Sequence, residues 1–363
     1  LNIRSNLRLI NVEPVMNVGN SFLLNAGVYG LISRMTLYSN DQVVCSLRDV
    51  AKYMAFKNLS GANAHHLDMK HPTIHSNIGV QYKEPNNKLN VTLDGVLLPD
   101  SNGSNNRIEV NQVLSYLQAN EVLSGFDNLR LVVEWNADLK EMVVYRDAPN
   151  TTTTITMLTP QLVYETSTKA GQNKTTYFAV ENDRLYINSI AVENDTQTTN
   201  QRINAYNNKI VKRILLVNYP LEENNSSVLR NLQSIAQSNE KITFTLNGRS
   251  LLPYGGLDNE AKKQAMLTEA FGDHITPVGS NWSAFENQDE IVEEDFLEQI
   301  YGGMSYGAVN IGERNEEFNV QYVRKGLGAD EDGVFRQQLH LYVFAEVVKY
   351  VNQSNGKIST GYA

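Results

Sequence analysis

Four of the six histidines in the sequence stand close together, where imidazole groups could share a metal ion. The stretch HHLDMKHPTIH contains them as His65, His66, His71 and His75. With Asp68 among them, these side chains are of the types that bind Zn²⁺ or Ni²⁺. Their spacing matches no zinc signature, and Pro72 indicates a loop. The sequence favours a solvated loop and leaves metal binding open as the alternative.

Two acidic stretches are the other candidates for site chemistry. The segment GADEDG places Asp330, Glu331 and Asp332 between glycines, and such oxygen ligands suit Ca²⁺, but the distal glutamate of an EF-hand is missing. A charged turn is therefore favoured, with Ca²⁺ binding as the alternative. The run ENQDEIVEEDFLEQI could supply the paired carboxylates of a glycosidase, and its acids are Glu286, Asp289, Glu290, Glu293, Glu294, Asp295 and Glu298. Runs of like charge are typical of solvated or partner-facing segments.

Composition excludes several further classes of function. The one cysteine, Cys45, lies in the apolar stretch QVVCSL, which favours a small buried hydrophobe over a catalytic thiol. No phosphate-binding or nucleophile motif is present. The net charge is −9 and the basic residues are scattered, so we expect no direct binding of nucleic acid. We expect no catalytic residue, no cofactor, no metal and no enzyme activity.

The start LNIRSNLRLI lacks the apolar core of a signal peptide, and no run approaches the roughly 18 apolar residues of a membrane span. We therefore expect a soluble chain that is not marked for secretion. Its 363 residues exceed what one hydrophobic core usually serves, which favours two domains.

Strands dominate the pattern along the chain. Short runs rich in Val, Ile, Thr, Tyr and Phe alternate with Asn, Gly, Asp and Ser. In NLRLVVEW the apolar residues Leu129, Leu131, Val133 and Trp135 recur with a period of two, as in a half-buried antiparallel strand. The pattern predicts an all-β sandwich or barrel.

One local pattern occurs twice. VTLDGVLLPD at 91–100 and FTLNGRSLLPYGG at 244–256 each join a strand end to an Asx-Gly pair and then to Leu-Leu-Pro. Asx-Gly pairs favour tight hairpin turns, because Gly adopts positive φ freely and Asx tolerates it. The sequence therefore predicts turns at Asp94-Gly95 and at Asn247-Gly248.

The elements around these turns follow the same order in both halves. The first half has a strand at 31–40, a helix at 47–58 capped by Ser46, the turn, a helix near 111–120 and closing strands. The second half has a strand at 210–219, a helix at 228–239, the turn, a helix near 259–271 and closing strands. Arg34 and Arg213 fall at the same place in their strands. The matched order predicts a duplicated β domain.

The polar stretch RDAPNTTTTITMLTP between the halves is predicted to be an extended linker. We expect the boundary near Asn150, with an N-terminal domain at 1–150 and a C-terminal domain at 151–363.

Three stretches carry a resemblance to a known family: GVYGLISRMTLYSNDQVVCSLRDVAKYMAF, NGRSLLPYGGLDNEAKKQAML and LHLYVFAEVVKYVNQSNGKISTGYA. With the repeated plan, they resemble the double jelly-roll major capsid proteins of tailless membrane-containing bacteriophages, adenovirus hexons, virophages and Polinton-like elements. The resemblance implies two tandem eight-stranded jelly-rolls with short inserted helices. The chain is short for the eukaryotic members, which favours a compact version without long surface towers.

The resemblance also implies a function. It indicates a major capsid protein that self-assembles as pseudo-hexagonal trimers into an icosahedral virion shell. Its expected partners are other copies of itself, minor capsid or vertex proteins and an internal membrane. The alternatives are a minor capsid protein, a receptor-binding or lectin-like viral protein, and a carbohydrate-active sandwich using Glu293, Glu294 or Asp295. The C-terminal stretch NQSNGKISTGYA is polar and without periodicity, so we expect it to be weakly ordered in an isolated subunit and to act in assembly.

Overall fold

The computed structural model of the chain describes its two halves unevenly. The described residues are 2–10, 12, 14–16, 21–23, 29, 31–50, 53–54, 108–123, 125–126, 128–136, 143–145, 155–157, 159–168, 179–192, 196–204, 206–221, 240–253, 255–271, 305–325, 334–354 and 357–363. The predicted turn at Asp94-Gly95 and the predicted helix at 228–239 lie outside these residues.

The second half of the chain contains eight consecutive strands in two antiparallel sheets. They are β13 (Ala179–Val192), β14 (Thr196–Ile203), β15 (Lys209–Leu221), β16 (Glu240–Leu246), β17 (Arg249–Ser250), β18 (Ser305–Asn315), β19 (Phe318–Lys325) and β20 (Val334–Val347). One sheet has the order β13-β20-β15-β18 and the other β14-β19-β16-β17. Counted from one to eight, the strands pair as 1-8-3-6 and 2-7-4-5, which is the topology of a jelly-roll.

The two sheets of this jelly-roll enclose one apolar core. Ile214 of β15 and Val343 of β20 enter it from the first sheet, and Phe244 of β16 and Phe318 of β19 enter from the second. The Phe244 and Phe318 rings are stacked, with centroids 6.0 Å apart. Residues that face the core recur at every second position along a strand, and this is the period of two seen in the sequence.

The turn between β16 and β17 confirms the prediction at Asn247-Gly248. Leu246 pairs directly with Arg249, so two residues make the connection. Asn247 has φ 51° and Gly248 has φ 75°, the pair of positive angles required by the type I′ hairpin turn. The Asn247 side chain also accepts a hydrogen bond from the backbone N–H of Glu317, at 2.8 Å, which ties this turn to the one that precedes β19.

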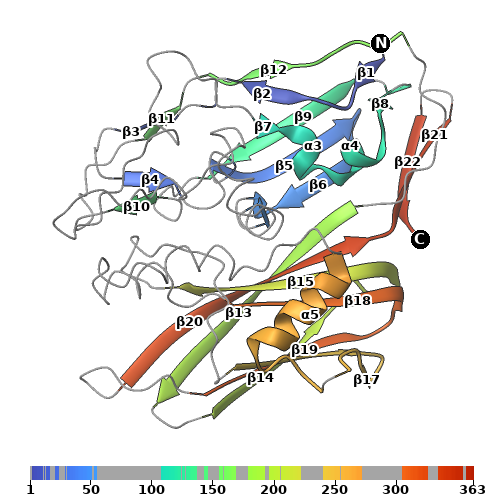
Figure 1. Ribbon diagram of the computed structural model, residues 1–363. Coiled ribbons are helices and arrows are strands. Elements are labelled where there is room, and N and C mark those ends of the chain that lie inside the picture. The colour runs from blue at the N-terminus through green and yellow to red at the C-terminus, as the bar shows by residue number, and fades with distance from the viewer. Residues whose placement is uncertain are drawn as a thin grey trace.

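The central strands of the sheet β13-β20-β15-β18, β15 and β20, have buried side chains on both faces. Ile214 and Val343 face the jelly-roll core, whereas their neighbours Leu215, Tyr342 and Phe344 belong to the core of the first half. Strands buried on both faces read as continuous apolar runs. Burial on both faces explains the apolar runs RILLV and LYVFAEVV. The same sheet joins the two halves of the chain (Figure 1).

The first half is built from shorter strands. They are β1 (Ile3–Arg4), β2 (Arg8–Ile10), β3 (Pro14–Met16), β4 (Ser21–Leu23), β5 (Ile32–Ser39), β6 (Gln42–Arg48), β7 (Ile108–Glu109), β8 (Val122–Leu123), β9 (Leu129–Trp135), β10 (Val143–Tyr145), β11 (Ile155–Met157) and β12 (Gln161–Val163). Two three-stranded sheets, β12-β2-β7 and β6-β5-β9, form its layers (Figure 1). The predicted strands 31–40 and 129–135 are confirmed.

Part of the polar stretch that follows β10 is a paired strand, so the prediction of a linker is wrong for residues 155–157. β11 lies within it and pairs with β3, and β12, just beyond it, pairs with β2. The Thr-rich composition is β-prone and polar, and it therefore suits a strand at the margin of a sheet as well as a linker. Residues as far as Ser167, whose N–H donates to the Asn2 carbonyl, belong with the first half.

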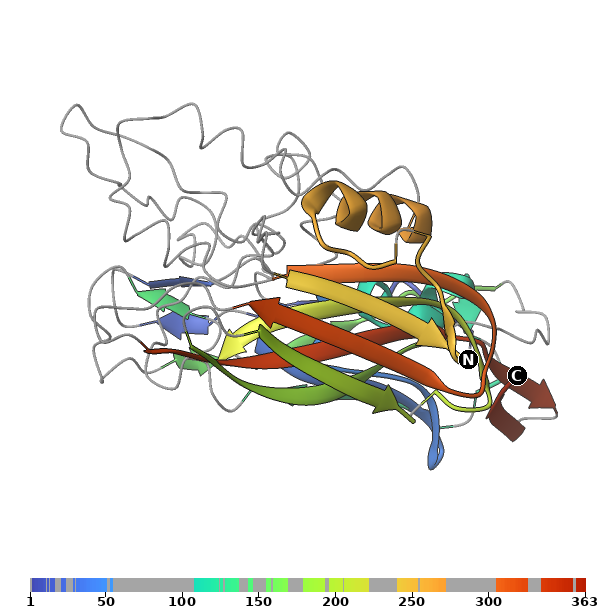
Figure 2. The ribbon, with the colours of Figure 1, turned by 90° about the horizontal axis from the view of Figure 1, so that it is seen from below.

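Two of the predicted helices are present at their expected places. The helix predicted near 111–120 is two short helices, α3 (Val110–Val113) and α4 (Ser115–Ala119), separated by the extended residue Leu114. The helix predicted near 259–271 is α5 (Glu260–Phe271). Its first turn is capped by Asn259, whose side-chain oxygen accepts the Lys262 N–H at 2.9 Å. Figure 2 shows α5 along the flank of the sandwich, where it contacts β18.

The helix predicted at 47–58 begins later than expected. β6 runs to Arg48, and helical residues first appear at Val50. Ser46 is not a helix cap, because its hydroxyl lies in the sheet and accepts a hydrogen bond from the Arg34 side chain at 3.2 Å. The two valines of the run VVCSL favour a strand. The pairing of β6 with β5 therefore prevails over the helix that the spacing of the apolar residues predicts.

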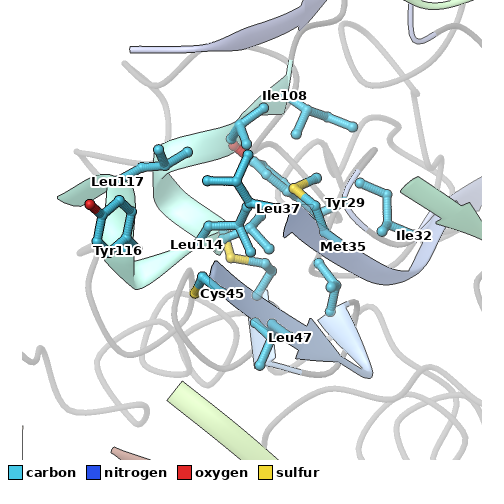
Figure 3. Packing of buried hydrophobic residues seen from close by; sticks show 14 of the residues in the cluster. Tyr29, Ile32, Met35, Leu37, Cys45, Leu47, Ile108, Leu114, Tyr116 and Leu117 are labelled. Carbon is cyan, nitrogen blue, oxygen red and sulfur yellow. The ribbon is translucent and has the colours of Figure 1, made fainter. Parts of the chain in front are cut away.

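The packing of the first half explains why this strand forms. Val44, Cys45 and Leu47 are buried in the core with Met35 and Leu37 of β5 (Figure 3). Figure 3 also shows Ile108, Leu114, Tyr116 and Leu117, from β7 and the α3–α4 pair, around the same core. Leu129, Leu131, Val133 and Trp135 pack against it from β9, as their spacing predicts.

The C-terminal stretch is ordered as a hairpin, so the expectation of a weakly ordered tail is wrong. β21 (Lys349–Ser354) pairs with β22 (Lys357–Tyr362). Val351 and Ile358 are buried in the core of the first half, which fixes the hairpin to the rest of the subunit. In Figures 1 and 2 the hairpin lies at the end of the molecule where both termini are found.

Candidate assembly surfaces

The residues considered for metal or carboxylate chemistry are not among those that the structure describes. His65, His66, His71 and His75, the segment 330–332 and the acidic run 286–298 all lie outside the described residues. Among the residues that are described, no group of three or more His, Cys, Asp or Glu side chains is placed to hold a metal ion.

Cys45 occupies the place that its sequence context predicts. It is buried in the first-half core, and its sulfur lies 3.7 Å from the Ser115 hydroxyl. Thiolate reactivity needs a partly exposed environment, so the burial of Cys45 favours a packing role.

Arg34 and Arg213 stand in the same local geometry. In β5, Ile32 pairs with Trp135 and Arg34 with Glu134, so Ser33 is an extra residue in the strand. In β15, Val211 pairs with Val347 and Arg213 with Glu346, so Lys212 is the extra residue. Each arginine thus follows a β-bulge and faces a glutamate on the neighbouring antiparallel strand. This shared detail supports the duplication, whose full superposition stays a prediction.

Arg213 also connects two layers of the second half. Besides its ion pair with Glu346, its guanidinium donates a hydrogen bond of 2.6 Å to the carbonyl oxygen of Ala270 in the last turn of α5. A cation at a helix C-terminus satisfies an otherwise unpaired carbonyl and complements the helix dipole. Arg213 therefore fixes α5 against β15 and β20.

The junction between the halves lies beside this arginine. The Tyr53 ring, from the helical residues after β6, packs against Phe344 of β20 with centroids 5.3 Å apart. Burial raises the pKa of the Tyr53 hydroxyl to about 12, and the Glu346 carboxylate adds to the rise. The hydroxyl is therefore neutral at physiological pH, and the junction is an apolar contact rather than a titrating one.

Large apolar side chains are exposed in two places on the described surface. They are Leu162, Val163 and Tyr164 at β12, and Tyr350 and Tyr362 on the C-terminal hairpin, all between 36% and 50% exposed. Grouped apolar residues on a surface mark interaction sites. Neither group was predicted from the sequence, although the run LVY after Pro160 was a signal for the first.

No helix in the described part of the chain is long and apolar enough to cross a membrane.

The known proteins to which this chain is similar share its structure and little of its sequence. No protein-family model matches the sequence, and no curated protein matches it. A chain in the cryo-EM structure of the Sputnik virophage is similar over 99% of this chain and 81% of its own length, with a TM-score of 0.56 and 10% identity. The major capsid protein of mavirus is similar over 99% of this chain and 82% of its own, with a TM-score of 0.55 and 8% identity.

A third similar structure is a chain of the PBCV-1 virus capsid. It matches 100% of this chain and 89% of its own length, with a TM-score of 0.51 and 10% identity. Identities this low carry information about the fold only. Together with the strand order of the second half, these likenesses show that the chain has the double jelly-roll fold.

Proposed function

We propose that this chain is a structural subunit of a virus capsid and acts by self-assembly rather than by catalysis. The extent of the structural likeness supports this most directly, because the similarity to the mavirus major capsid protein covers 99% of the chain. A match to a single jelly-roll would support far less, since single jelly-rolls serve many unrelated functions. The proposed location is the shell of the virion.

The internal construction suits such a role. The strands β15 and β20 contribute side chains to both cores, so the two halves share these strands and form one block. A subunit that must tile a shell needs a fixed shape, and packed cores resist deformation. The net charge of −9 opposes direct contact with a nucleic acid, which suits a shell protein better than a genome-binding one.

The proposed assembly unit is a trimer. Three copies around a threefold axis would place six similar lobes in a ring, and this pseudo-hexagonal outline can tile an icosahedral shell. Closed cyclic symmetry is how most homo-oligomers satisfy their interfaces. The further partners that we propose for such a shell are minor capsid or vertex proteins and an internal membrane.

We also propose the domain boundary near residue 168 rather than at 150. β11 and β12 pair with strands of the N-terminal segment, and β13 is the first strand of the second jelly-roll. A fragment ending at 168 is expected to retain its first-half pairing, whereas one ending at 150 loses both strands.

Light scattering on the purified chain, followed by electron microscopy, tests the proposed function. The expected result is a species with three times the mass of the 40.8 kDa chain and a threefold outline, which then forms closed shells. A monomer that persists at micromolar concentration would overturn the proposal. Glycan binding by that monomer would favour the lectin-like alternative.

A further inference from the structure

β12 is an outer strand that carries exposed apolar side chains on both of its faces. Among the described residues it is the last strand of the sheet β12-β2-β7, at the margin of the first half (Figure 1). Successive side chains of a strand point to opposite faces, so Leu162 and Tyr164 lie on one face and Val163 on the other. Their exposed fractions are 45%, 50% and 38%. Both faces of this strand are therefore uncovered at the same place.

The hydrogen-bonding groups of this edge also point away from the subunit. The Glu165 carbonyl accepts the Arg4 N–H at 2.8 Å, so Glu165 points toward the N-terminal segment. Backbone groups alternate sides along a strand, and those of Leu162 and Tyr164 consequently point outward. Within the described part of the chain no strand lies beside them. An open strand edge with apolar side chains is a template for another strand.

Exposure on both faces determines which kind of element can cover β12. A helix or loop packed on one face of the sheet would leave the side chains of the other face exposed. A strand added in the plane of the sheet has neighbours for Leu162 and Tyr164 on one face and for Val163 on the other, because residues directly opposite in an antiparallel pair share a face. The element that fits this edge is therefore an extended strand.

The sequence of β12 makes it complementary to itself. In an antiparallel pair about a twofold axis through Val163, Val163 lies opposite Val163 of the partner subunit, and Leu162 lies opposite Tyr164 of the partner subunit. Each apolar residue then meets an apolar residue, and Glu165 meets the Gln161 amide of the partner subunit. Residues 159–168 contain no Lys or Arg and only this one acid, so the contact brings no like charges together.

The backbone fits the same register. In an antiparallel ladder, a pair whose N–H and C=O groups point away from the partner is flanked by two hydrogen-bonded pairs. With Val163 at the axis, the outward groups of Leu162 and Tyr164 form these flanking pairs. Pro160 is the next residue with this orientation, and it has no N–H to donate, so it limits the ladder to the apolar residues.

We propose that β12 pairs antiparallel with β12 of a second subunit about a twofold axis, and that this contact joins neighbouring trimers in the shell. The inference rests on the proposed self-assembly. A ring with threefold symmetry alone has no twofold axis, so an isologous contact must lie between rings. Stable interfaces bury about 1,200–2,000 Å² in total, more than a ladder of a few residues supplies. The contact therefore acts only where trimers present several copies together, since linked sites bind at a raised effective concentration.

Cysteine oxidation tests the register, because the native Cys45 is buried and will not compete. The Cα atoms of the pair at the axis should lie about 4.5 Å apart, within the range that a disulfide spans. Shells of the Val163→Cys chain should therefore yield, on mild oxidation, a covalent dimer of the 40.8 kDa chain in a non-reducing gel. Isolated trimers of the same variant should yield none.

Leu162→Cys is the matched control, because it places a thiol on the same exposed edge. In the proposed register its Cα atom lies about 8–9 Å from that of its counterpart, beyond the reach of a disulfide. Equal cross-linking at both positions would indicate random collisions and would overturn the pairing.

The remaining outcomes separate this inference from the proposed function. Shells without a disulfide at residue 163 would show that β12 faces something other than its own copy, and dimers from isolated trimers would place the contact within the ring. Either result overturns the pairing and leaves the capsid role intact. A chain that stays monomeric refutes both.

A proline variant gives an independent readout. The Tyr164 N–H points outward, so Tyr164→Pro removes a hydrogen bond between subunits and keeps those to the N-terminal segment. The loss occurs twice at a twofold contact, and the concentration needed for shell formation should rise by about tenfold or more. Light scattering should show unchanged trimers. Shells that form at the concentration of the unsubstituted chain, from a variant with an unchanged circular dichroism spectrum, would contradict the pairing.

Discussion

Replacing Arg213 with alanine should destabilise the protein more than the same change at Arg34, although both residues occupy the same bulge geometry. The difference lies in burial. The side chains of Arg213 and Glu346 are 25% and 16% exposed, whereas those of Arg34 and Glu134 are 36% and 53% exposed, with 3.8 Å between the charged atoms. Solvent screens the second pair much more than the first.

The expected magnitudes follow from these environments. Breaking a fully buried pair costs about 3–5 kcal/mol and losing a cation at a helix C-terminus about 0.3–1 kcal/mol, so partial exposure suggests about 2–3 kcal/mol for Arg213→Ala. An exposed pair contributes about 0–1 kcal/mol and the hydrogen bond to Ser46 about 1 kcal/mol, so Arg34→Ala should cost about 1 kcal/mol.

Urea unfolding measures both values. Tryptophan fluorescence, to which Trp135 beside the first-half core contributes, and far-UV circular dichroism should report coincident transitions if the shared sheet makes unfolding cooperative. Arg213→Lys is the matched control, since it keeps the charge and loses the planar fork. Equal losses at Arg213 and Arg34, or a coupling energy near zero in a double-mutant cycle with Glu346→Ala, would refute the reasoning.

Three further changes should give equally distinct results. The pKa of Tyr53 is about 12 in the folded chain against an unfolded value near 10, so the protonated hydroxyl contributes fully to stability below pH 10. This contribution is lost as the pH rises through 12, by up to about 1.4 kcal/mol per pH unit. Urea midpoints between pH 9 and 12 should therefore fall less for Tyr53→Phe than for the unsubstituted chain, and parallel curves would contradict this. Gly248→Ala forces a side chain into φ 75° and should cost about 1 kcal/mol, and Gly248→Asn clearly less, when their urea midpoints are compared. Deleting 355–363 removes Ile358 from the core and should lower the free energy of unfolding by about 2–4 kcal/mol; an unchanged urea midpoint would show that the hairpin is dispensable for folding.

Local rules predicted the parts of the fold that depend on neighbouring residues. The Asn247-Gly248 turn, the strand at 129–135 and the α5 helix follow from φ preference, alternation and capping, and each of these acts within a few positions of the chain. In the C-terminal hairpin Ser354 pairs with Lys357, and the sequence between them is Asn355-Gly356, a pair of the type that favours tight turns. The polar composition of the tail concealed this signal, because only Val351 and Ile358 mark its buried face.

Features that depend on distant partners were not predictable in this way. Ser46 has the residue type and position of a helix cap, yet β6 pairs with β5 and the buried positions of Cys45 and Leu47 decide the outcome. The exposed edge at β12 depends on where the N-terminal segment lies, which is a contact across about 150 residues of sequence. No local pattern contains that information.

The shared sheet separates the residues that should control folding from those that should control assembly. One face of β15 and β20 packs in the jelly-roll core and the other in the core of the first half, so substitutions there disturb both halves at once. The buried positions of these two strands offer no surface to a neighbouring subunit. The large apolar side chains that the described surface exposes lie elsewhere, at β12 and on the C-terminal hairpin. The hairpin contains residues of both kinds, because Val351 enters the core on one face while Tyr350 remains exposed on the other. Tyr350→Ser should therefore weaken assembly with little loss of stability. Val351→Ser should instead destabilise the fold itself.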